Sequence, residues 1–345
     1  MGFFDKLFSK TKNDTTPATP KAIAPTPSAS NATDIPPFQG DYAKTIFLWA
    51  LNRISTVKSN DEYVRYFLYE LGIANPSAYH NQLISEGYFA KASSSEKLNT
   101  LKVSELKQLL TDRGQSATGK KDALIEKLTS CISDEEMVRL FPATHYVLSE
   151  KGQAFIDEHN DYVLVHQHKN WGIDWKDYDA HKKPGYSFFD IVWSILNERV
   201  LTDTHSFGRN SYLCMYQLLK EENRKANALE MLLQVLYIDF SGSLGMDCYS
   251  LFKNNIYSKQ ELLDCFNIAM MIAPGLINDL SAFADVYNEG IVDHVCERRL
   301  PVQICSKELF QRIICSVLNG TYDESEAKIL LKKHTVILLT DCKVY

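Results

Sequence analysis

A short stretch of the chain, GQSATGKKDALIEKL at residues 114–128, is nearly a phosphate-binding loop. Nucleotide-binding P-loops follow the pattern G-x-x-x-x-G-K-[ST], and Gly114 and Gly119-Lys120 stand at the required spacing. Such a loop binds phosphate because it joins a β-strand to a helix whose N-terminal amides are free. A Ser or Thr hydroxyl that follows then binds Mg²⁺. Whether this stretch can hold a nucleotide therefore depends on the residues that flank it.

The flanking residues argue against a nucleotide pocket. Before the loop, Val103, Leu106 and Leu110 recur at helical spacing, so the preceding segment is predicted to be a helix rather than a strand. The position that should offer a hydroxyl to Mg²⁺ is Lys121, whose ammonium group cannot bind a cation. The chain also lacks G-x-G-x-x-G, H-E-x-x-H and G-x-S-x-G motifs, so no cofactor and no catalytic residue is predicted.

The same residues predict two amphipathic helices joined by a turn. The first helix spans about 104–112, the turn runs from Gly114 to Thr118, and the second helix spans about 120–130. Over residues 100–130 the pattern resembles the SAP domain family, small nucleic-acid-binding modules of two roughly parallel helices. The residues that carry the resemblance are Leu101, Val103, Leu106-Lys107, Leu109 or Leu110, Gly114, Gly119-Lys120-Lys121, Leu124-Ile125 and Leu128. Gln115 departs from the family, which usually has an apolar residue there.

The resemblance implies DNA binding, and the chemistry of the turn is consistent with it. Gly119 has no side chain, so the backbone can approach a phosphate closely. The N-terminus of the second helix offers free N–H groups and a partial positive charge, to which Lys120 and Lys121 add two cations. The predicted contact residues are Lys107, Arg113, Thr118, Gly119, Lys120 and Lys121.

Charge limits how such a module can bind. The chain has a formal net charge of −6, which argues against a protein that coats nucleic acid by bulk charge. Between Thr100 and Ser130, six basic residues stand against four acidic ones, so the sign is reversed locally. We therefore expect weak, salt-sensitive and largely sequence-neutral contact with DNA. The alternative is that these lysines form only a solvated helix face, as charged helix faces usually do, or that the module docks a protein.

A longer helical unit, predicted over residues 41–170, surrounds the module. Helical periodicity and end signals predict helices at 41–56, 60–73 and 75–87. Farther along, Tyr146–Leu148 and Tyr162–Val165 are predicted to be strands with a helix between them. The helices and the later Tyr-x-Leu-Ser-x-x-Gly element loosely resemble a winged-helix domain with its helix-turn-helix. This interpretation places the SAP-like module at the position of the first wing strands. It predicts that two DNA-facing units share one rigid body.

The C-terminal domain, residues 171–345, is predicted to be all-α. Helices are expected at 187–201, 212–219, 228–238, 258–273, 276–288, 306–318 and 323–333. The last segment, 334–345, is either a strand or the end of a helix. Paired helices with a Tyr- and Leu-rich seam faintly resemble a tetratricopeptide repeat, although no constant period appears. Stacked helical layers of this kind commonly present a groove, which predicts a protein partner.

The N-terminal residues predict an anchor on a tether. Residues 1–10, MGFFDKLFSK, place their large apolar side chains on one helical face, as in segments that dock weakly on membranes or proteins. Such a short segment can also be a frayed terminus. Residues 11–40 are rich in Pro, Thr, Ala and Ser, and six of the eleven prolines lie within 11–37. This composition predicts a disordered linker.

The spacing of the cysteines and histidines predicts no metal centre. The eight cysteines are dispersed without a C-x-x-C pair, which predicts reduced thiols and a cytoplasmic protein that can associate with DNA. No apolar run is long enough to span a membrane. His166 and His168 would share one face of a strand, but no further ligand stands at a fixed spacing, so a surface pair is favoured. Trp171 and Trp175 are expected to pack where two domains dock.

These patterns together predict a mainly α protein with three parts: a tether, a helix-turn-helix or winged-helix-like unit that contains the SAP-like module, and an all-α domain that is repeat-like. The predicted function is non-catalytic DNA binding with recruitment of a protein partner. One alternative is an interaction adaptor that never touches DNA. A second is an enzyme of unrecognised type in the C-terminal domain.

Overall fold

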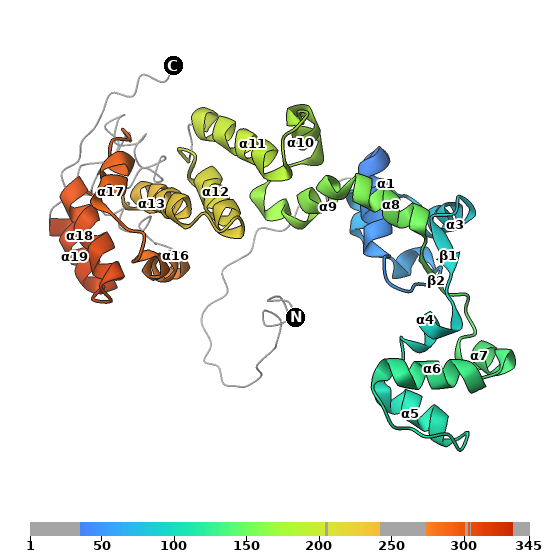
Figure 1. Ribbon diagram of the computed structural model, residues 1–345. Coiled ribbons are helices and arrows are strands. Elements are labelled where there is room, and N and C mark those ends of the chain that lie inside the picture. Colours follow the sequence, from blue (N-terminus) through green and yellow to red (C-terminus); the bar gives the residue numbers. More distant parts are fainter. Residues whose placement is uncertain (1–34, 204–205, 242–273, 301–302, 304, 334–345) are drawn as a thin grey trace, which may run out of the picture.

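The computed structural model describes residues 35–203, 206–241, 274–300, 303 and 305–333 (Figure 1). The predicted amphipathic segment, most of the predicted linker, the helix at 258–273 and the ending at 334–345 lie outside this part of the chain. Within it the protein is mainly α-helical, as predicted. None of the helices described is long and apolar enough to cross a membrane.

A two-stranded sheet organises the first half of the protein. Strands β1 (Phe89–Lys91) and β2 (Tyr146–Leu148) pair antiparallel, with Phe89 opposite Leu148. The ladder is short, but it joins segments that lie far apart in the chain. Residues 92–145 are therefore an insertion whose two ends leave from neighbouring strands.

The helices of the N-terminal unit enclose an aromatic core next to this sheet. They are α1 (Gly40–Ala50), α2 (Tyr66–Tyr69), α3 (Pro76–Ser85), α8 (Glu150–Glu158) and α9 (Asn160–Gln167). Phe47, Phe67 and Leu83 are almost completely buried, and the rings of Phe47 and Phe67 lie 4.7 Å apart. The side chain of Asn75 caps α3 by accepting a hydrogen bond from the Ala78 N–H at 2.9 Å.

Two predicted helices in this unit are wrong in extent. The helix expected at 41–56 ends at Ala50. The helix expected at 60–73 is a 3₁₀ turn at Asn60–Glu62, followed later by the single turn of α2. The carboxylate of Glu62 accepts hydrogen bonds from the Ser59 backbone and hydroxyl, and this local closure replaces a continuous helix.

The strand predicted at Tyr162–Val165 is wrong, because these residues belong to α9. Val163 is buried in the N-terminal core, whereas Val165 is buried in the C-terminal core. The helix passes between two cores, so it carries a short unbroken apolar run, YVLV, which by sequence alone resembles a buried strand.

The insertion has a hydrophobic core of its own. Its helices are α4 (Ser94–Leu98), α5 (Val103–Thr111), α6 (Lys121–Cys131) and α7 (Asp134–Leu140). Leu98 of α4 and Met137 of α7 join the leucines of α5 and α6 in one buried cluster, separate from the clusters of the other units. The two helices predicted here are confirmed to within a residue or two at each end, and Figure 1 shows the insertion projecting from the sheet.

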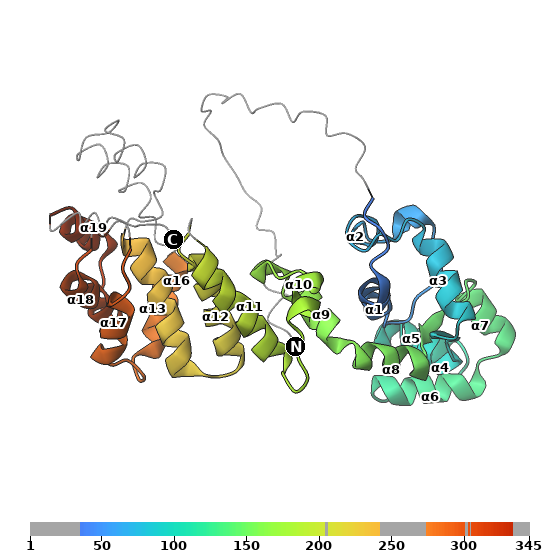
Figure 2. The same ribbon diagram turned by 90° about the horizontal axis from the view of Figure 1, so that it is seen from above.

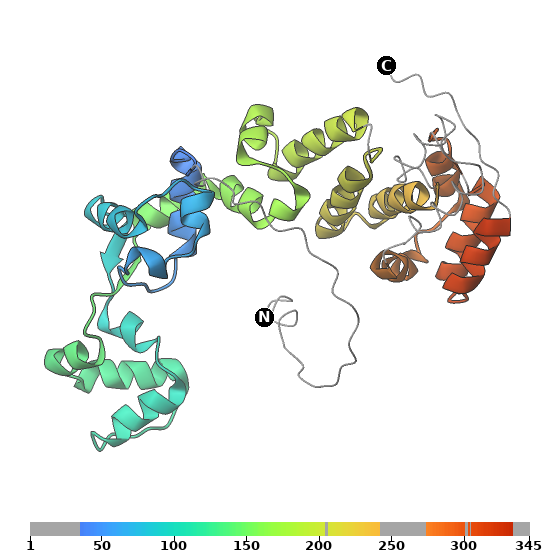
Figure 3. The same cartoon turned by 180° about the vertical axis from the view of Figure 1, so that it is seen from behind.

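The C-terminal domain is a row of helices in which neighbours in sequence pack together. The described helices are α10 (Trp175–His181), α11 (Phe188–Thr202), α12 (Arg209–Glu221), α13 (Lys225–Ser241), α16 (Pro274–Leu280), α17 (Glu289–Cys296), α18 (Lys307–Leu318) and α19 (Glu324–Lys333). Figures 2 and 3 show α11, α12 and α13 side by side. The helix predicted at 276–288 is wrong in extent, since α16 ends at Leu280 and a 3₁₀ turn follows. The repeat-like character stays a prediction.

The N-terminal unit and the C-terminal domain meet at α9 and α10. The ring of Trp175 stacks on Tyr42 of α1, with centroids 5.4 Å apart and planes 12° from parallel. Trp171 lies in the C-terminal core, where its indole N–H donates to Gln217 at 2.8 Å. Trp175 thus packs at the joint between these two parts, as predicted, whereas Trp171 packs within the C-terminal domain.

Candidate nucleic-acid interface

Helices α5 and α6 hold the predicted contact residues in place by packing their apolar faces together. Leu106 and Leu110 of α5 and Leu124 and Leu128 of α6 are fully buried. They recur every four residues, so each pair lies on one side of its helix. Burying a leucine stabilises a fold by roughly 1.5–3 kcal/mol, and these four side chains pack the two helices together.

A glycine ends α5 and turns the chain toward α6. Gly114 has a φ of +66°, in the left-handed region that favours glycine. The N–H of Gly114 donates to the Thr111 carbonyl, and the N–H of Gln115 donates to the Leu110 carbonyl, both at 2.9 Å. This pair of bonds is a Schellman motif, so the turn at residues 114–120 starts from a fixed geometry. Gln115 is exposed, and its polar side chain does not disturb the core.

A second glycine starts α6 and leaves its N-terminus open. Gly119 has a φ of +129°, which other residues rarely adopt. Lys120 is the N-cap residue, and no side chain caps the amides of the first turn. Those amides have no intrahelical acceptor, and the helix dipole places partial positive charge there. The start of α6 can therefore accept an anion.

The predicted basic residues fall into two groups. Lys107 and Lys120 are exposed, and within the described chain no hydrogen bond or ion pair engages their ammonium groups. They remain available to an external anion. Thr118 is also exposed, and its hydroxyl lies 2.9 Å from that of Ser116.

Arg113 and Lys121 are instead engaged inside the protein. Arg113 donates to the Leu109 carbonyl at 2.6 Å and forms an ion pair of 2.8 Å with Glu136 of α7. A hydrogen bond from the Ser133 backbone, together with this pair, lowers the pKa of the Glu136 carboxyl. Lys121 donates to the Asn99 carbonyl at 2.6 Å, which fastens the start of α6 to the end of α4.

Lys127, which the sequence did not single out, holds the turn from the second turn of α6. Its ammonium group donates to the carbonyl of Thr118 at 2.9 Å and to that of Ser116 at 3.2 Å. Lys127 occupies a polar position of α6, where a lysine is normally solvated. Its spacing in the sequence therefore did not indicate this contact.

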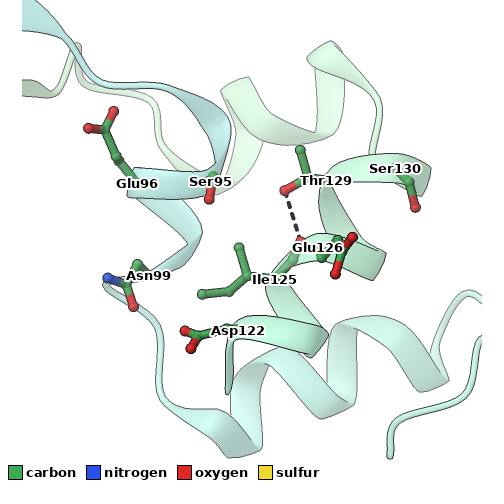
Figure 4. Close-up of a pocket in the computed structure, with 8 residues that line it drawn as sticks. All are labelled: Ser95, Glu96, Asn99, Asp122, Ile125, Glu126, Thr129 and Ser130. Carbon is green, nitrogen blue, oxygen red and sulfur yellow. Dashed lines mark hydrogen bonds between the residues drawn. The ribbon is translucent and has the colours of Figure 1, made fainter. Parts of the chain in front are cut away.

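Carboxylates gather where α6 faces α4. A hollow of about 480 Å³ lies between α4 and α6, and Figure 4 shows the side chains that surround it. Glu96, Asp122 and Glu126 contribute its charge, and Ile125 lies between the two helices. The Thr129 hydroxyl donates to the Ile125 carbonyl at 2.8 Å. Its carboxylates repel phosphate, so the surface that suits an anion is the one that carries the exposed Lys107 and Lys120.

Helix α3, the second DNA-facing element that a winged helix implies, offers no cation. Its sequence PSAYHNQLIS contains neither lysine nor arginine. Its exposed Gln82 donates instead to Glu86 at 2.7 Å. Phosphate contacts come mainly from basic side chains, so the surface of α3 adds little to an electrostatic footprint.

The two histidines of the VHQHKNW segment lie on a helix rather than on a strand. His166 faces Tyr42, with 3.2 Å between its Nδ1 and the phenol oxygen, and burial lowers its pKa to about 4. His168 ends α9 and lies 3.2 Å from Glu221. Among the residues placed by the structure, no group of three His, Cys, Asp or Glu side chains could hold a metal ion.

A comparison with known families decides what the insertion is. Residues 97–130 match the family model of the SAP domain. These residues are a SAP domain. It comprises the last two residues of α4, then α5, the turn at residues 114–120 and nearly all of α6. Helix α7, which supplies Glu136, lies outside the residues that match the SAP domain.

Other comparisons are more limited. The E3 SUMO-protein ligase SIZ1 of Arabidopsis thaliana is 34% identical over 68 residues, which are 20% of this chain and 8% of that protein. The chain thus spans less than a tenth of this relative's length. No solved structure matches the chain, and the winged-helix resemblance stays a prediction.

Sequence reasoning missed the helices on both sides of the SAP domain, although a signal was present. Ser93 and Glu96, and likewise Ser133 and Glu136, stand three residues apart at the starts of α4 and α7. In each case the glutamate accepts from the serine N–H, which is the capping box that marks a helix start.

Proposed function

We propose that this protein binds duplex DNA non-catalytically through its SAP domain. The observation that carries the proposal is the open N-terminus of α6, where Gly119 leaves space and Lys120 is exposed and unpaired within the described chain. Lys107 adds a second available cation. With only a few phosphates neutralised, binding is weak, roughly 10⁻⁶ to 10⁻⁴ M at physiological salt, and largely indifferent to sequence.

The test is a titration of fluorescently labelled duplex DNA with the full chain at several salt concentrations. We expect log K to fall linearly with log salt, with a slope of about −2 to −3. Lys120→Glu should weaken binding about tenfold or more. Lys58→Glu is the matched control, because Lys58 is exposed in the N-terminal unit and makes no ion pair with a described residue. Equal effects of the two changes would remove the SAP domain from the contact.

We further propose that the C-terminal domain recruits a protein partner. Tyr186 and Leu201, near opposite ends of α11, expose 55% and 78% of their surface, which is unusual for large apolar side chains. Leu201→Asp should abolish co-purification of that partner while leaving the unfolding temperature unchanged. Retained co-purification would point to another surface.

An adaptor that never touches DNA is the second candidate. It is favoured by the internal engagement of Arg113, Lys121 and Lys127, which removes three of the six basic side chains between Thr100 and Ser130 from the footprint. In that case the DNA titration gives no salt-dependent signal, while the partner still binds.

A reducing, cytoplasmic location, with association to DNA, completes the proposal. The described cysteines are free thiols, and burial raises the pKa of Cys214 to about 11. A buried thiol of this kind is a poor nucleophile and resists oxidation. Imaging of the tagged full chain should therefore place it with DNA in the cytoplasm or nucleoid.

A further inference from the structure

The backbone of the turn at residues 114–120 is hydrogen-bonded by a lysine of the following helix. Lys127 lies on α6, within the SAP domain, and its ammonium group donates to the carbonyls of Ser116 and Thr118. Lys127 is only half-exposed, and it makes no ion pair with a described carboxylate. Two of its three donors are therefore used on the backbone of the turn.

These two bonds fix the direction of the neighbouring amides. The described peptide bonds are all trans, and in a trans peptide the C=O of one residue and the N–H of the next point in opposite directions. With the carbonyls of Ser116 and Thr118 directed at Lys127, the N–H groups of Ala117 and Gly119 point the other way. Neither N–H donates to an acceptor within the described chain.

We propose that Lys127 is a positioning residue for DNA binding: it draws two carbonyls of the turn inward and so presents the Ala117 and Gly119 amides to a DNA phosphate. The proposal rests on the proposed function of the SAP domain. Without Lys127, the same carbonyls are free to face the phosphate and repel it. The lysine acts through the backbone and does not itself touch DNA.

This role differs measurably from that of a phosphate-contacting lysine. A cation that contacts phosphate releases about one counterion, so its loss changes the salt slope by about 0.9. Loss of a positioning residue removes uncharged amide contacts and leaves the slope unchanged. Lys120, exposed beside the turn, serves as the example of a contacting cation.

The experiment compares Lys127→Met with Lys97→Met, Lys120→Met and Lys127→Arg in the full chain, using the labelled duplex as probe. Lys97 is the matched control for lost charge, because it lies on α4 and its ammonium group has no polar partner among the described residues. We expect Lys127→Met to bind about tenfold more weakly than Lys97→Met, with the slope of the unmodified chain. Lys127→Arg should recover most of the affinity, since a guanidinium can also donate to two carbonyls.

A second readout does not depend on DNA. In the deuterated full chain without DNA, Lys127→Met should shift the backbone amide resonances of Ala117 and Gly119, whereas Lys97→Met should leave them in place. If Lys127→Met lowers the salt slope as Lys120→Met does, or binds no worse than Lys97→Met, the positioning role is wrong. If the unmodified chain shows no salt-dependent binding, the proposed function fails instead, and the amide shifts still report whether Lys127 sets the turn.

Discussion

Acidification should weaken the unit that carries the SAP domain, through one buried histidine. His80 of α3 is fully buried, and its ring packs against Phe89 of β1 and Tyr146 of β2. Its Nδ1 lies 2.9 Å from the Tyr63 hydroxyl, and its Nε2 is buried without a hydrogen-bond partner among the described residues. Burial therefore lowers the pKa of His80 to about 4, and protonation places an uncompensated charge beneath the sheet.

The sign and size of the effect follow from this value. An unfolded histidine has a pKa of about 6.5, so the unfolded chain binds more protons than the folded chain between pH 6.5 and about 4. The stabilising contribution is therefore complete above pH 6.5 and is lost progressively as the pH falls toward 4. The whole loss amounts to about 3 kcal/mol, an appreciable part of a typical domain's stability.

Urea unfolding at intervals from pH 7.5 to 4.5 measures this dependence. His166, also with a pKa of about 4, contributes in the same direction, so the informative quantity is the difference between the unmodified chain and His80→Gln. We expect the difference in stability between the two to shrink as the pH falls. The ring resonances of His80 in the unmodified chain give its pKa directly. A titration of that ring near pH 6.5, or parallel stability curves for both proteins, would refute the reasoning.

Two further substitutions test single contacts. Gly152→Ala should destabilise the N-terminal unit by about 1–3 kcal/mol in urea unfolding, because a Cβ there would clash with the Tyr88 carbonyl; full stability would mean that α8 can move aside. Arg113→Gln should lower the thermal unfolding midpoint by a few degrees, since it removes the Glu136 ion pair and the bond to the end of α5, yet leave the salt slope of DNA binding unchanged. A slope reduced as much as by Lys120→Gln would return Arg113 to the DNA contact.

The SAP domain could be predicted from the sequence because its signals are local. Leu106, Leu110, Leu124 and Leu128 set both helices by spacing alone, and Gly119 marks a backbone that other residues rarely adopt. The direction of a long cationic side chain is not local. Arg113 pairs with Glu136 of α7, a helix beyond the domain, and no spacing within the domain indicates this partner; its contact with DNA stays a prediction.

The N-terminal unit was harder to predict because its core is formed by segments that lie far apart in the sequence. Val163 and Val165 are buried on opposite sides of α9, and no single-helix pattern describes a helix between two cores. The residues that begin α4 and α7 carried clear capping signals, but both helices are shorter than eight residues and have little periodicity of their own.

The pairing of β1 with β2 also determines how the insertion that contains the SAP domain could be removed or replaced. The ladder continues for one more hydrogen bond, from the Ala92 N–H to the His145 carbonyl at 2.9 Å, so the two ends of the insertion that contains the SAP domain leave at adjacent points. A protease that cuts one of these ends leaves the insertion tethered by the other. Replacing residues 93–144 by a two-residue hairpin turn should remove the whole insertion with the parent unit intact, and the same position could accept a different module.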